Sequence, residues 1–254
     1  MHTRLSSRLA LGVLALASAG PALADDPAPA IACTGSLTAA SDYRFRGLTQ
    51  TSEDPAVQGS IECAHASSGV YAGVWASNVS WLSDLSSADL PVSNSLEVDY
   101  YAGWRHGFGE GWGLDVGVYG YYYPGDYPHG FVRPYTTDVF AGVTYATFGA
   151  KLWHTVTNAF GFADSHDSDY LEANWNPTFG EGWTLNLHAG HQRIDAFGDA
   201  DYTDWKVGVT KDLGKGFSAS AAYIDTNADD AVYTNPQGEQ LGDATVVVTI
   251  AKSF

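Results

Sequence analysis

The sequence predicts an all-β fold: a single antiparallel transmembrane β-barrel of about 12 strands, with short periplasmic turns and long external loops. Three observations predict this fold. Only 16% of the 254 residues are charged, against roughly 25% in an ordinary soluble domain. Apolar and polar residues alternate with period 2 over most of the chain. The connections between these alternating segments are short and long in turn.

The composition excludes two classes of protein. The chain has 12 Lys and Arg against 29 Asp and Glu, a formal net charge of −17, and nucleic-acid binding needs clustered basic residues that neutralise phosphates. No apolar run after the N-terminus approaches the ~20 residues of a membrane-spanning helix. A β-rich secreted or outer-membrane protein is therefore expected, with no nucleic acid among its partners.

The N-terminus has the three parts of a secretory signal peptide. Arg4 and Arg8 precede the apolar stretch Leu9–Ala17, and Ala22-Leu23-Ala24 fits a small-x-small cleavage site. The apolar stretch is too short to span ~30 Å of hydrocarbon, which argues against a membrane anchor. The predicted division of the chain is a signal peptide at 1–24, a short periplasmic segment at 25–32 and an outer-membrane barrel at 33–254.

Strands are predicted wherever apolar and polar residues alternate. Between residues 96 and 104, apolar side chains at even positions alternate with Glu97, Asp99, Tyr101 and Gly103. Each such strand has one apolar and one polar face. The predicted strands begin near residues 33, 56, 69, 95, 112, 135, 148, 168, 183, 202, 216 and 243.

Connections of two lengths alternate between these strands. Tight turns at one end and long polar loops at the other indicate that the two ends of the sheet face different compartments, as in outer-membrane barrels. The short connections are Ser67–Gly69, Gly107–Gly111, Thr147–Gly149, Thr178–Gly182 and Leu213–Gly216, and the long ones are Gly47–Pro55, Ser80–Asn94, Pro124–Pro134, Asn158–Asp167, Asp195–Asp201 and Thr226–Gly242.

Three of the short turns share an apolar-Gly-x-Gly-aromatic pattern. They are Phe108–Trp112, Phe179–Trp183 and Leu213–Phe217. The glycines suit the positive φ angles of hairpin turns, and the aromatic residues suit a girdle at the membrane interface. The pattern lacks the GxGxxG spacing and the following helix of a nucleotide-binding loop.

The last strand ends on Phe254, as outer-membrane barrels habitually do. The ending resembles the signal that the barrel-assembly machinery reads, although Lys252 stands where an apolar residue or Tyr is usual. The barrel-assembly machinery, outer-membrane lipid and lipopolysaccharide are therefore the expected partners.

Several stretches of the mature chain match one known family. They are Asp42–Gly47 with Thr49–Thr51, Pro55–Gly59, Gly69–Val79, Glu97–Gly103 and Tyr121–Gly125. In these stretches the chain resembles the TorF-type porin family of Gram-negative bacteria. The resemblance implies an outer-membrane barrel and leaves the transported solute open.

The polar face of each strand is expected to line the lumen. The pore-lining candidates are Asp42, Arg44, Arg46, Glu62, Glu97, Asp99, Arg105, Asp115, Asp138, Glu172, His188 and Lys206, with Lys151, Asn174, Tyr101, Tyr119 and Tyr121 on the same face. Both signs of charge occur, so these side chains form either a paired network that fills the interior or the wall of a narrow aqueous path. About 12 strands lie between a filled 8-stranded barrel and an open 16-stranded one.

Arg44 and Arg46 are the strongest individual candidates. Both share a face with Asp42, near the external end of the first predicted strand. Two guanidinium groups there either bind an anionic group of the solute or pair with acidic side chains of the barrel.

The two cysteines allow a geometric test. If Cys33 pairs with Cys63, the bracketed hairpin centres on residue 48, inside the first long loop. Directly opposed residues of antiparallel strands have Cα atoms ~4.5–5.5 Å apart, within disulfide range. A structural disulfide is predicted over two free buried thiols because export leads to an oxidising compartment.

The excess acidic residues fall mostly in the long loops. A solvated surface explains them, and divalent-cation binding is the alternative. Asp225-x-Asn227-x-Asp229 begins like a calcium loop, but Asp230 and Pro236 replace the required Gly and Glu. No metal site and no cofactor are predicted.

The predicted function is passive diffusion of small hydrophilic solutes or ions through an outer-membrane channel. A non-conducting structural or adhesion barrel is the main alternative. A membrane-embedded lipid hydrolase is a further alternative, because some barrels use Ser and His, and His188 is the least implausible site. The chain has no GxSxG nucleophile motif, so no enzyme is predicted.

Overall fold

The computed structural model describes residues 30–254. The predicted signal peptide at 1–24 and residues 25–29 of the predicted periplasmic segment lie outside this range. The first strand begins at Ile31, two residues before the predicted start of the barrel. Within the described range, no helix is long and apolar enough to cross a membrane.

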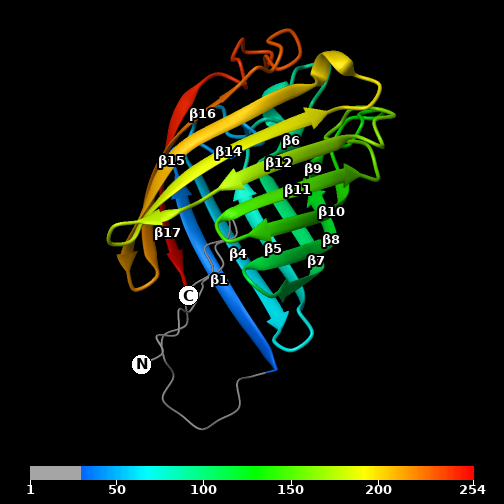
Figure 1. Ribbon diagram of the computed structural model, residues 1–254. Helices are drawn as coiled ribbons and strands as arrows, with labels where there is room; N and C mark the ends of the chain where they lie inside the picture. Colours follow the sequence, from blue (N-terminus) through cyan, green and yellow to red (C-terminus); the bar gives the residue numbers. More distant parts are fainter. Residues whose placement is uncertain (1–29) are drawn as a thin grey trace, which may run out of the picture.

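The strands form one antiparallel barrel (Figure 1). Its strands are β1 (Ile31–Ala40), β4 (Ala56–His65), β5 (Val70–Asn78), β7 (Leu96–Phe108), β8 (Trp112–Tyr122), β10 (Thr136–Tyr145), β11 (Phe148–Thr155), β12 (Asp169–Trp175), β14 (Trp183–Arg193), β15 (Tyr202–Gly214), β16 (Phe217–Thr226) and β17 (Thr245–Ser253). Each strand pairs with its neighbours in the chain, and β1 pairs with β17 to close the ring. The twelve predicted strands are thereby confirmed.

The remaining elements are short. They are β2 (Arg44–Phe45), β3 (Leu48–Thr49), β6 (Ser93–Asn94), β9 (Gly125–Asp126), β13 (Thr178–Phe179) and the 3₁₀ turns η1 (Ser83–Leu85) and η2 (Gly198–Ala200). All except β13 lie in the six long connections, which gather at one end of the barrel, and the tight turns gather at the other (Figure 1). The predicted alternation of connection length is therefore present in the fold.

Turn glycines are needed where a short connection reverses the chain. In the β7–β8 turn, Gly109 and Gly111 have φ values of 38° and 90°, and Gly214 and Gly216 in the β15–β16 turn have 82° and 78°. Side chains other than glycine rarely adopt these angles. The repeated Gly-x-Gly pattern therefore makes tight turns, as expected from the sequence.

The strand pleat separates two environments. Apolar side chains such as Val57, Tyr100 and Ile250 point outward and are more than half exposed, at 66%, 56% and 58%. Their neighbours along the strands point into the barrel, where Glu97 and Asp138 are buried. An apolar outer surface around a polar interior is the reverse of a soluble protein and suits a barrel surrounded by lipid.

Cys33 and Cys63 form a disulfide, as the sequence predicts. They are directly opposed on β1 and β4, with Cα atoms 4.0 Å apart. Both share the outward face of their strands with Leu37 and Ile61. The bond therefore ties the first two barrel strands together near the end that carries the tight turns.

Candidate functional site: the barrel lumen

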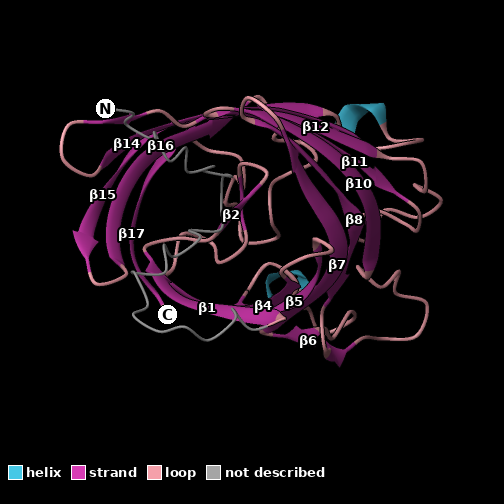
Figure 2. Cartoon of the chain, turned by 60° about the horizontal axis from the view of Figure 1, so that its bottom comes forward, coloured by secondary structure: helices cyan, strands magenta, loops and turns pink. Residues whose placement is uncertain are grey.

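The connection from β1 to β4 folds into the barrel. Its strands β2 and β3 pair at Arg44↔Thr49 and Phe45↔Leu48, and Figure 2 shows β2 inside the ring of barrel strands. We call residues 41–55 the lumen hairpin. Gly47 at its tip, with φ of 82°, lies so close to β15 and β16 that an added Cβ would stand 2.7 Å from Asp204 and 2.4 Å from Thr226. The tip of the hairpin thus packs against β15 and β16.

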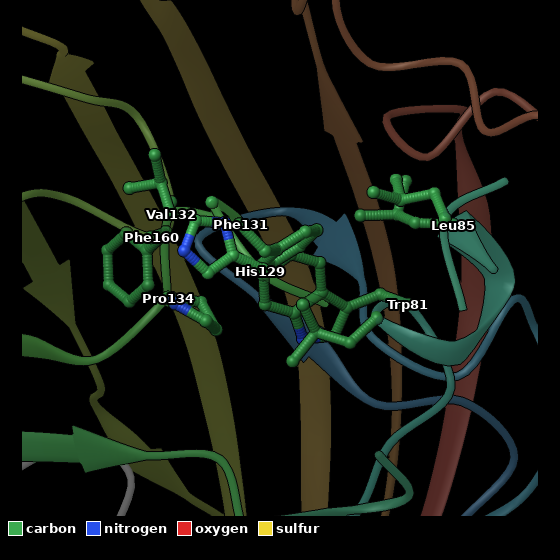
Figure 3. Close-up of a pocket in the computed structure, with 11 residues that line it drawn as sticks. Trp81, Leu85, His129, Phe131, Val132, Pro134 and Phe160 are labelled. Carbon is green, nitrogen blue, oxygen red and sulfur yellow. The ribbon is translucent and has the colours of Figure 1, made fainter. Parts of the chain in front are cut away.

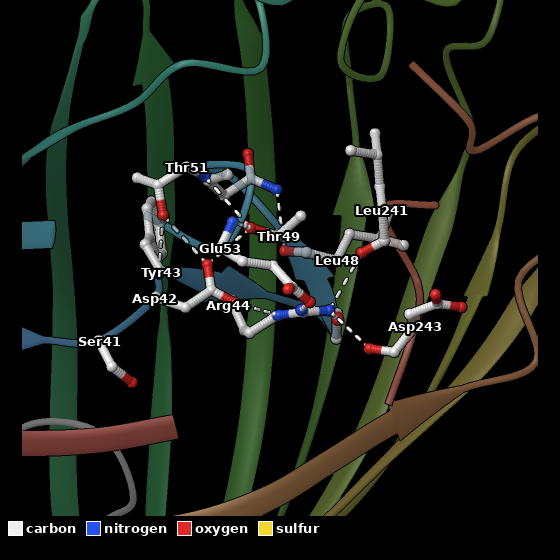
Figure 4. A network of polar contacts seen from close by, with 12 residues as sticks. Ser41, Asp42, Tyr43, Arg44, Leu48, Thr49, Thr51, Glu53, Leu241 and Asp243 are labelled. Carbon is white, nitrogen blue, oxygen red and sulfur yellow. Dashed lines mark hydrogen bonds and ion pairs between the residues drawn. The ribbon is translucent and has the colours of Figure 1, made fainter. Parts of the chain in front are cut away.

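Arg44 holds the base of the lumen hairpin (Figure 4). Its guanidinium forms an ion pair with Asp42, donates at 2.9 Å to Glu53 and donates at 3.1 and 2.9 Å to the carbonyl oxygens of Leu241 and Asp243. The side chain is 2% exposed. Arg44 therefore joins the hairpin to the β16–β17 loop, and its guanidinium is not presented to a solute.

Arg46 holds the tip of the lumen hairpin. It donates hydrogen bonds of 2.8 Å to the Asp138 carboxylate on β10 and 2.7 Å to the Gln192 amide oxygen on β14. The Tyr170 ring lies 4.4 Å from the guanidinium carbon, within cation–π range. With 5% of its side chain exposed, Arg46 is a buried anchor.

These two arginines do not lie on the first barrel strand, where the sequence analysis placed them. The strand ends at Ala40, and Asp42, Arg44 and Arg46 belong to the lumen hairpin. The apparent continuation of the strand pattern arises because β2 is itself extended and alternating. The interpretation as paired structural arginines agrees with this geometry, whereas an exposed anion-binding pair does not.

One row of residues in register carries charge around the barrel. The row runs Arg105↔Asp115↔Gly142↔Lys151↔Glu172↔Gly190↔Asp204 across seven adjacent strands. Long side chains lie across its two glycines. An added Cβ at Gly142 would stand 2.9 Å from the Lys151 side chain, and one at Gly190 would stand 2.0 Å from the Tyr170 oxygen. Five of the seven positions are therefore ionisable, with both signs present.

Ion pairs neutralise the part of this row nearest the tight turns. Arg105 donates to both oxygens of Glu62 at 2.8 and 3.2 Å, and its guanidinium carbon lies 3.8 Å from the centre of the Tyr71 ring. Tyr71 in turn donates to Asp115 at 2.6 Å, and Lys151 donates to the other Asp115 oxygen at 3.0 Å. Charges inside a barrel require such partners.

His188 centres a second network, on the β12–β15 side. Its Nε2 lies 2.8 Å from Asp204 and 3.0 Å from the Tyr170 oxygen, and its Nδ1 lies 2.9 Å from Asn174. Within residues 30–254, no serine hydroxyl is hydrogen-bonded to His188, so the arrangement is not a nucleophile–base pair. Lys206 is the register partner of His188 on the same lumen face.

Glu97 and Asp99 are buried without a cationic partner in the described part of the chain. Tyr123 donates to Glu97 at 2.8 Å and Tyr119 to Asp99 at 3.0 Å, while the second oxygen of each carboxyl group makes no hydrogen bond there. Burial, and then the charges of Glu97 and Asp99, raise the pKa of Tyr43 in the lumen hairpin well above its usual value. The Tyr43 phenol therefore stays neutral.

Large and small side chains line different sides of the lumen. On β5, β7, β8 and β10 large inward side chains are buried, including Tyr71, Tyr101, Tyr121 and Phe140. We call the lumen faces of β16, β17 and β1 the neutral wall. Its residues are uncharged and mostly small and partly exposed: Ser218, Ser220, Ala222, Ile224 and Thr226; Thr245, Val247, Thr249, Ala251 and Ser253; Ala32, Thr34, Ser36, Thr38 and Ala40. Small, partly exposed side chains thus line this wall.

The predicted lumen residues are gathered as the alternation of the strands implies. Glu62, Glu97, Asp99, Arg105, Asp115, Asp138, Glu172, His188 and Lys206 all project inward from barrel strands. Sequence reasoning missed Asp204 and Gln192, although each shares its strand face with a predicted residue. It also missed Tyr71 and Tyr170, whose inward positions follow from the same alternation.

A closed ring with tight turns at one end, long loops at the other and ion-paired side chains inside is the architecture of an outer-membrane β-barrel. Residues 24–254 match a family described as bacterial protein of unknown function (Gcw_chp), and the chain belongs to this family. A search of curated proteins finds no match.

Solved porin structures share the fold. The KdgM porin covers 87% of this chain and 98% of its own with a TM-score of 0.53 at 6% identity. The KdgM porin in complex with disordered oligogalacturonate has a TM-score of 0.50 at 8% identity, over 87% and 99% of the two chains. An outer membrane channel from Pseudomonas putida F1 is 13% identical, with a TM-score of 0.48 over 90% and 99%.

Proposed function

We propose that this protein is a porin-like channel of the outer membrane, through which small hydrophilic solutes or ions diffuse passively. The observation that carries the proposal is the difference between the two sides of the lumen. Large side chains and ion pairs occupy the β5–β12 side, whereas the neutral wall keeps small, partly exposed side chains. The fold shared with KdgM supports it.

The lumen hairpin sets the narrowest level of the proposed path. Arg44 and Arg46 fix it at its base and at its tip, and Gly47 contacts β15 and β16 at Asp204 and Thr226. Solutes pass beside the hairpin, along the part of the neutral wall that lies away from its contact at Thr226.

Ion conductance in planar lipid bilayers tests the proposal. Purified protein refolded in detergent should give discrete conductance steps, with a reversal potential under a salt gradient that reports its ion preference. Replacing residues 43–50 of the hairpin with a short Gly-Ser linker should enlarge the steps. Folded protein that gives no steps in either form would refute the channel.

A non-conducting structural or adhesion barrel is the second candidate, and the hairpin favours it. Gly47 packs against Asp204 on β15 and Thr226 on β16, while Arg46 binds Asp138 on β10, so the hairpin spans the lumen. A closed barrel predicts no conductance for the intact protein and conductance only after the hairpin is removed. The same bilayer experiment therefore separates the two candidates.

The proposed location brings its own partners. Outer-membrane lipid and lipopolysaccharide would surround the apolar outer surface, and the barrel-assembly machinery would read the terminal strand β17 and Phe254. Lys252 at the unusual position points outward, and its Nζ lies 4.7 Å from the centre of the Phe217 ring. Lys252→Tyr should therefore be tolerated during assembly, whereas removal of Phe254 should slow it.

A further inference from the structure

We propose that the preferred solutes of this channel are neutral saccharide-like rings, which present hydroxyl groups at their edges and C–H groups on their faces. The inference rests on the proposed channel function and adds the class of solute. Three features of the lumen and of the external loops support it.

The first feature is the row of hydroxyl groups on and beside the neutral wall. Thr184, Thr210, Ser220 and Thr249 occupy one register row across β14 to β17. The Ser220 and Thr249 hydroxyl oxygens lie 2.6 Å apart and share a hydrogen bond, so both are held in place. Such hydroxyls donate and accept hydrogen bonds and match the edge of a polyol.

Other hydroxyls of the neutral wall are available to a solute. Thr38 and Ser218 both flank Ala251 in the next register row. Their hydroxyl groups make no hydrogen bond to any of residues 30–254, and both side chains are partly exposed. They are therefore free to exchange hydrogen bonds with water for hydrogen bonds with a passing solute.

The second feature is the engagement of the opposing charges. Glu62 is paired with Arg105, Asp115 with Lys151 and Asp138 with Arg46. A charged solute that took one member of such a pair as its partner would leave the other member buried and uncompensated. A neutral solute has no such requirement.

The third feature is an aromatic and aliphatic pocket among the external loops, of about 460 Å³ (Figure 3). Its lining includes Trp81 and Leu85 of the β5–β7 loop, Phe131 of the β8–β10 loop and Phe160 of the β11–β12 loop. Phe160 also packs against Phe45 of the lumen hairpin, with ring centroids 5.3 Å apart. The pocket therefore adjoins the lumen hairpin.

The volume and lining of the pocket suit a ring with an apolar face. Pockets for small molecules are ~300–1,000 Å³ and are mostly apolar with a few polar groups. A sugar ring can lay its C–H face on Trp81 or Phe131 and then meet the hydroxyls of the neutral wall. Around the mouth, acidic loop residues such as Glu53, Asp84 and Asp243 disfavour anionic rings.

A swelling assay with three matched solutes tests the inference. Proteoliposomes are diluted into isotonic glucose, gluconate or glucosamine, and ion conductance is measured on the same preparation. Glucose should enter several-fold faster than either charged solute. Equal entry of all three solutes, or faster entry of a charged one, would overturn the proposed preference. Measurable conductance in the same preparation would still support the proposed channel function. Absence of both swelling and conductance would refute both proposals.

Paired variants locate the preference within the molecule. Thr38→Val with Ser218→Ala removes free hydroxyls from the neutral wall, and Trp81→Ala with Phe131→Ala removes the apolar surface of the pocket. Each pair should lower glucose entry several-fold and leave conductance nearly unchanged. Thr144→Val on β10 and Phe197→Ala in the β14–β15 loop are the matched controls. Unchanged glucose entry in both pairs, or an equal loss in the controls, contradicts the assignment.

Discussion

The Arg46 guanidinium of the lumen hairpin donates a hydrogen bond of 2.8 Å to the Asp138 carboxylate of β10, 92 residues further along the chain. Asp138 is fully buried and also accepts a 2.7 Å hydrogen bond from Thr155. The first external connection is therefore fastened to the barrel wall by a buried ion pair. This contact holds the tip of the hairpin across the lumen.

Arg46→Ala should loosen the lumen hairpin and destabilise the barrel. Breaking a buried ion pair from one side typically costs about 3–5 kcal/mol, because the remaining charge stays buried. We expect a lower thermal unfolding temperature in detergent and larger, noisier conductance steps. Arg46→Met combined with Asp138→Leu removes both charges and should recover much of the stability. If Arg46→Ala has the unfolding temperature and the conductance noise of the wild type, the hairpin does not depend on this ion pair.

Arg44→Ala should free the base of the hairpin from the β16–β17 loop. The variant loses the hydrogen bonds to the Leu241 and Asp243 carbonyl oxygens. Limited proteolysis of the folded protein should then cut within residues 227–244 faster than in the wild type. Arg133→Ala, which removes an exposed arginine from another external loop, is the control and should leave the cleavage rate unchanged. Equal cleavage in both variants would argue against the anchoring role.

The same substitution at two lumen glutamates should have opposite effects. Glu97→Gln keeps an acceptor for Tyr123 and removes a buried carboxyl group that has no cationic partner among residues 30–254, so thermal stability at neutral pH should rise. Glu62→Gln weakens the pair with Arg105, so stability should fall by about 1–3 kcal/mol. Unfolding of both variants in urea gives the comparison. A loss of stability in Glu97→Gln would mean that the charge of Glu97 has a partner.

Gly190→Ala should disturb the His188 network from a position two residues further along the same strand, β14. The new Cβ would stand 2.0 Å from the Tyr170 oxygen, which must move away from His188 and Asp204. Overpacking of this kind costs about 1–3 kcal/mol. Gly198→Ala in η2, where no atom lies within 4 Å of the added Cβ, is the control. Equal unfolding temperatures of the two variants would contradict the close packing at Gly190.

The disulfide should contribute stability without controlling conduction. Cys33→Ser with Cys63→Ser removes a link that closes a segment of 30 residues and should cost about 2–4 kcal/mol. Conductance should stay the same, because both side chains lie on the outer face. Thiol labelling of the unreduced, denatured wild type should detect no free thiol. Labelling of two thiols would show that the bond does not form.

The barrel could be predicted from the sequence because the features that specify it are local. Alternation within each strand and the length of each connection are read from neighbouring residues, and the starts of all twelve strands fall within two residues of the predicted ones. The directly opposed cysteines followed from the same alternation. Every predicted residue on a barrel strand points into the lumen for this reason.

The lumen hairpin could not be foreseen in this way. Arg44, Phe45 and Arg46 continue the alternation of the first strand, and their partners Leu241, Asp138 and Gln192 are distant in the sequence. An inward loop depends on such long-range contacts, which leave no local pattern. The available space depends likewise on the sizes of side chains from opposite walls, so the neutral wall emerges only when the ring closes.

The link between Cys33 and Cys63 encloses the whole lumen hairpin in a covalent ring. A protease that cuts the chain once between these residues opens the ring but releases no fragment, because both new ends remain joined through the sulfur atoms. A nicked barrel would therefore keep its hairpin and its first strand until a reductant separates them. The apparent resistance of this protein to surface proteolysis should thus differ between reducing and non-reducing gels.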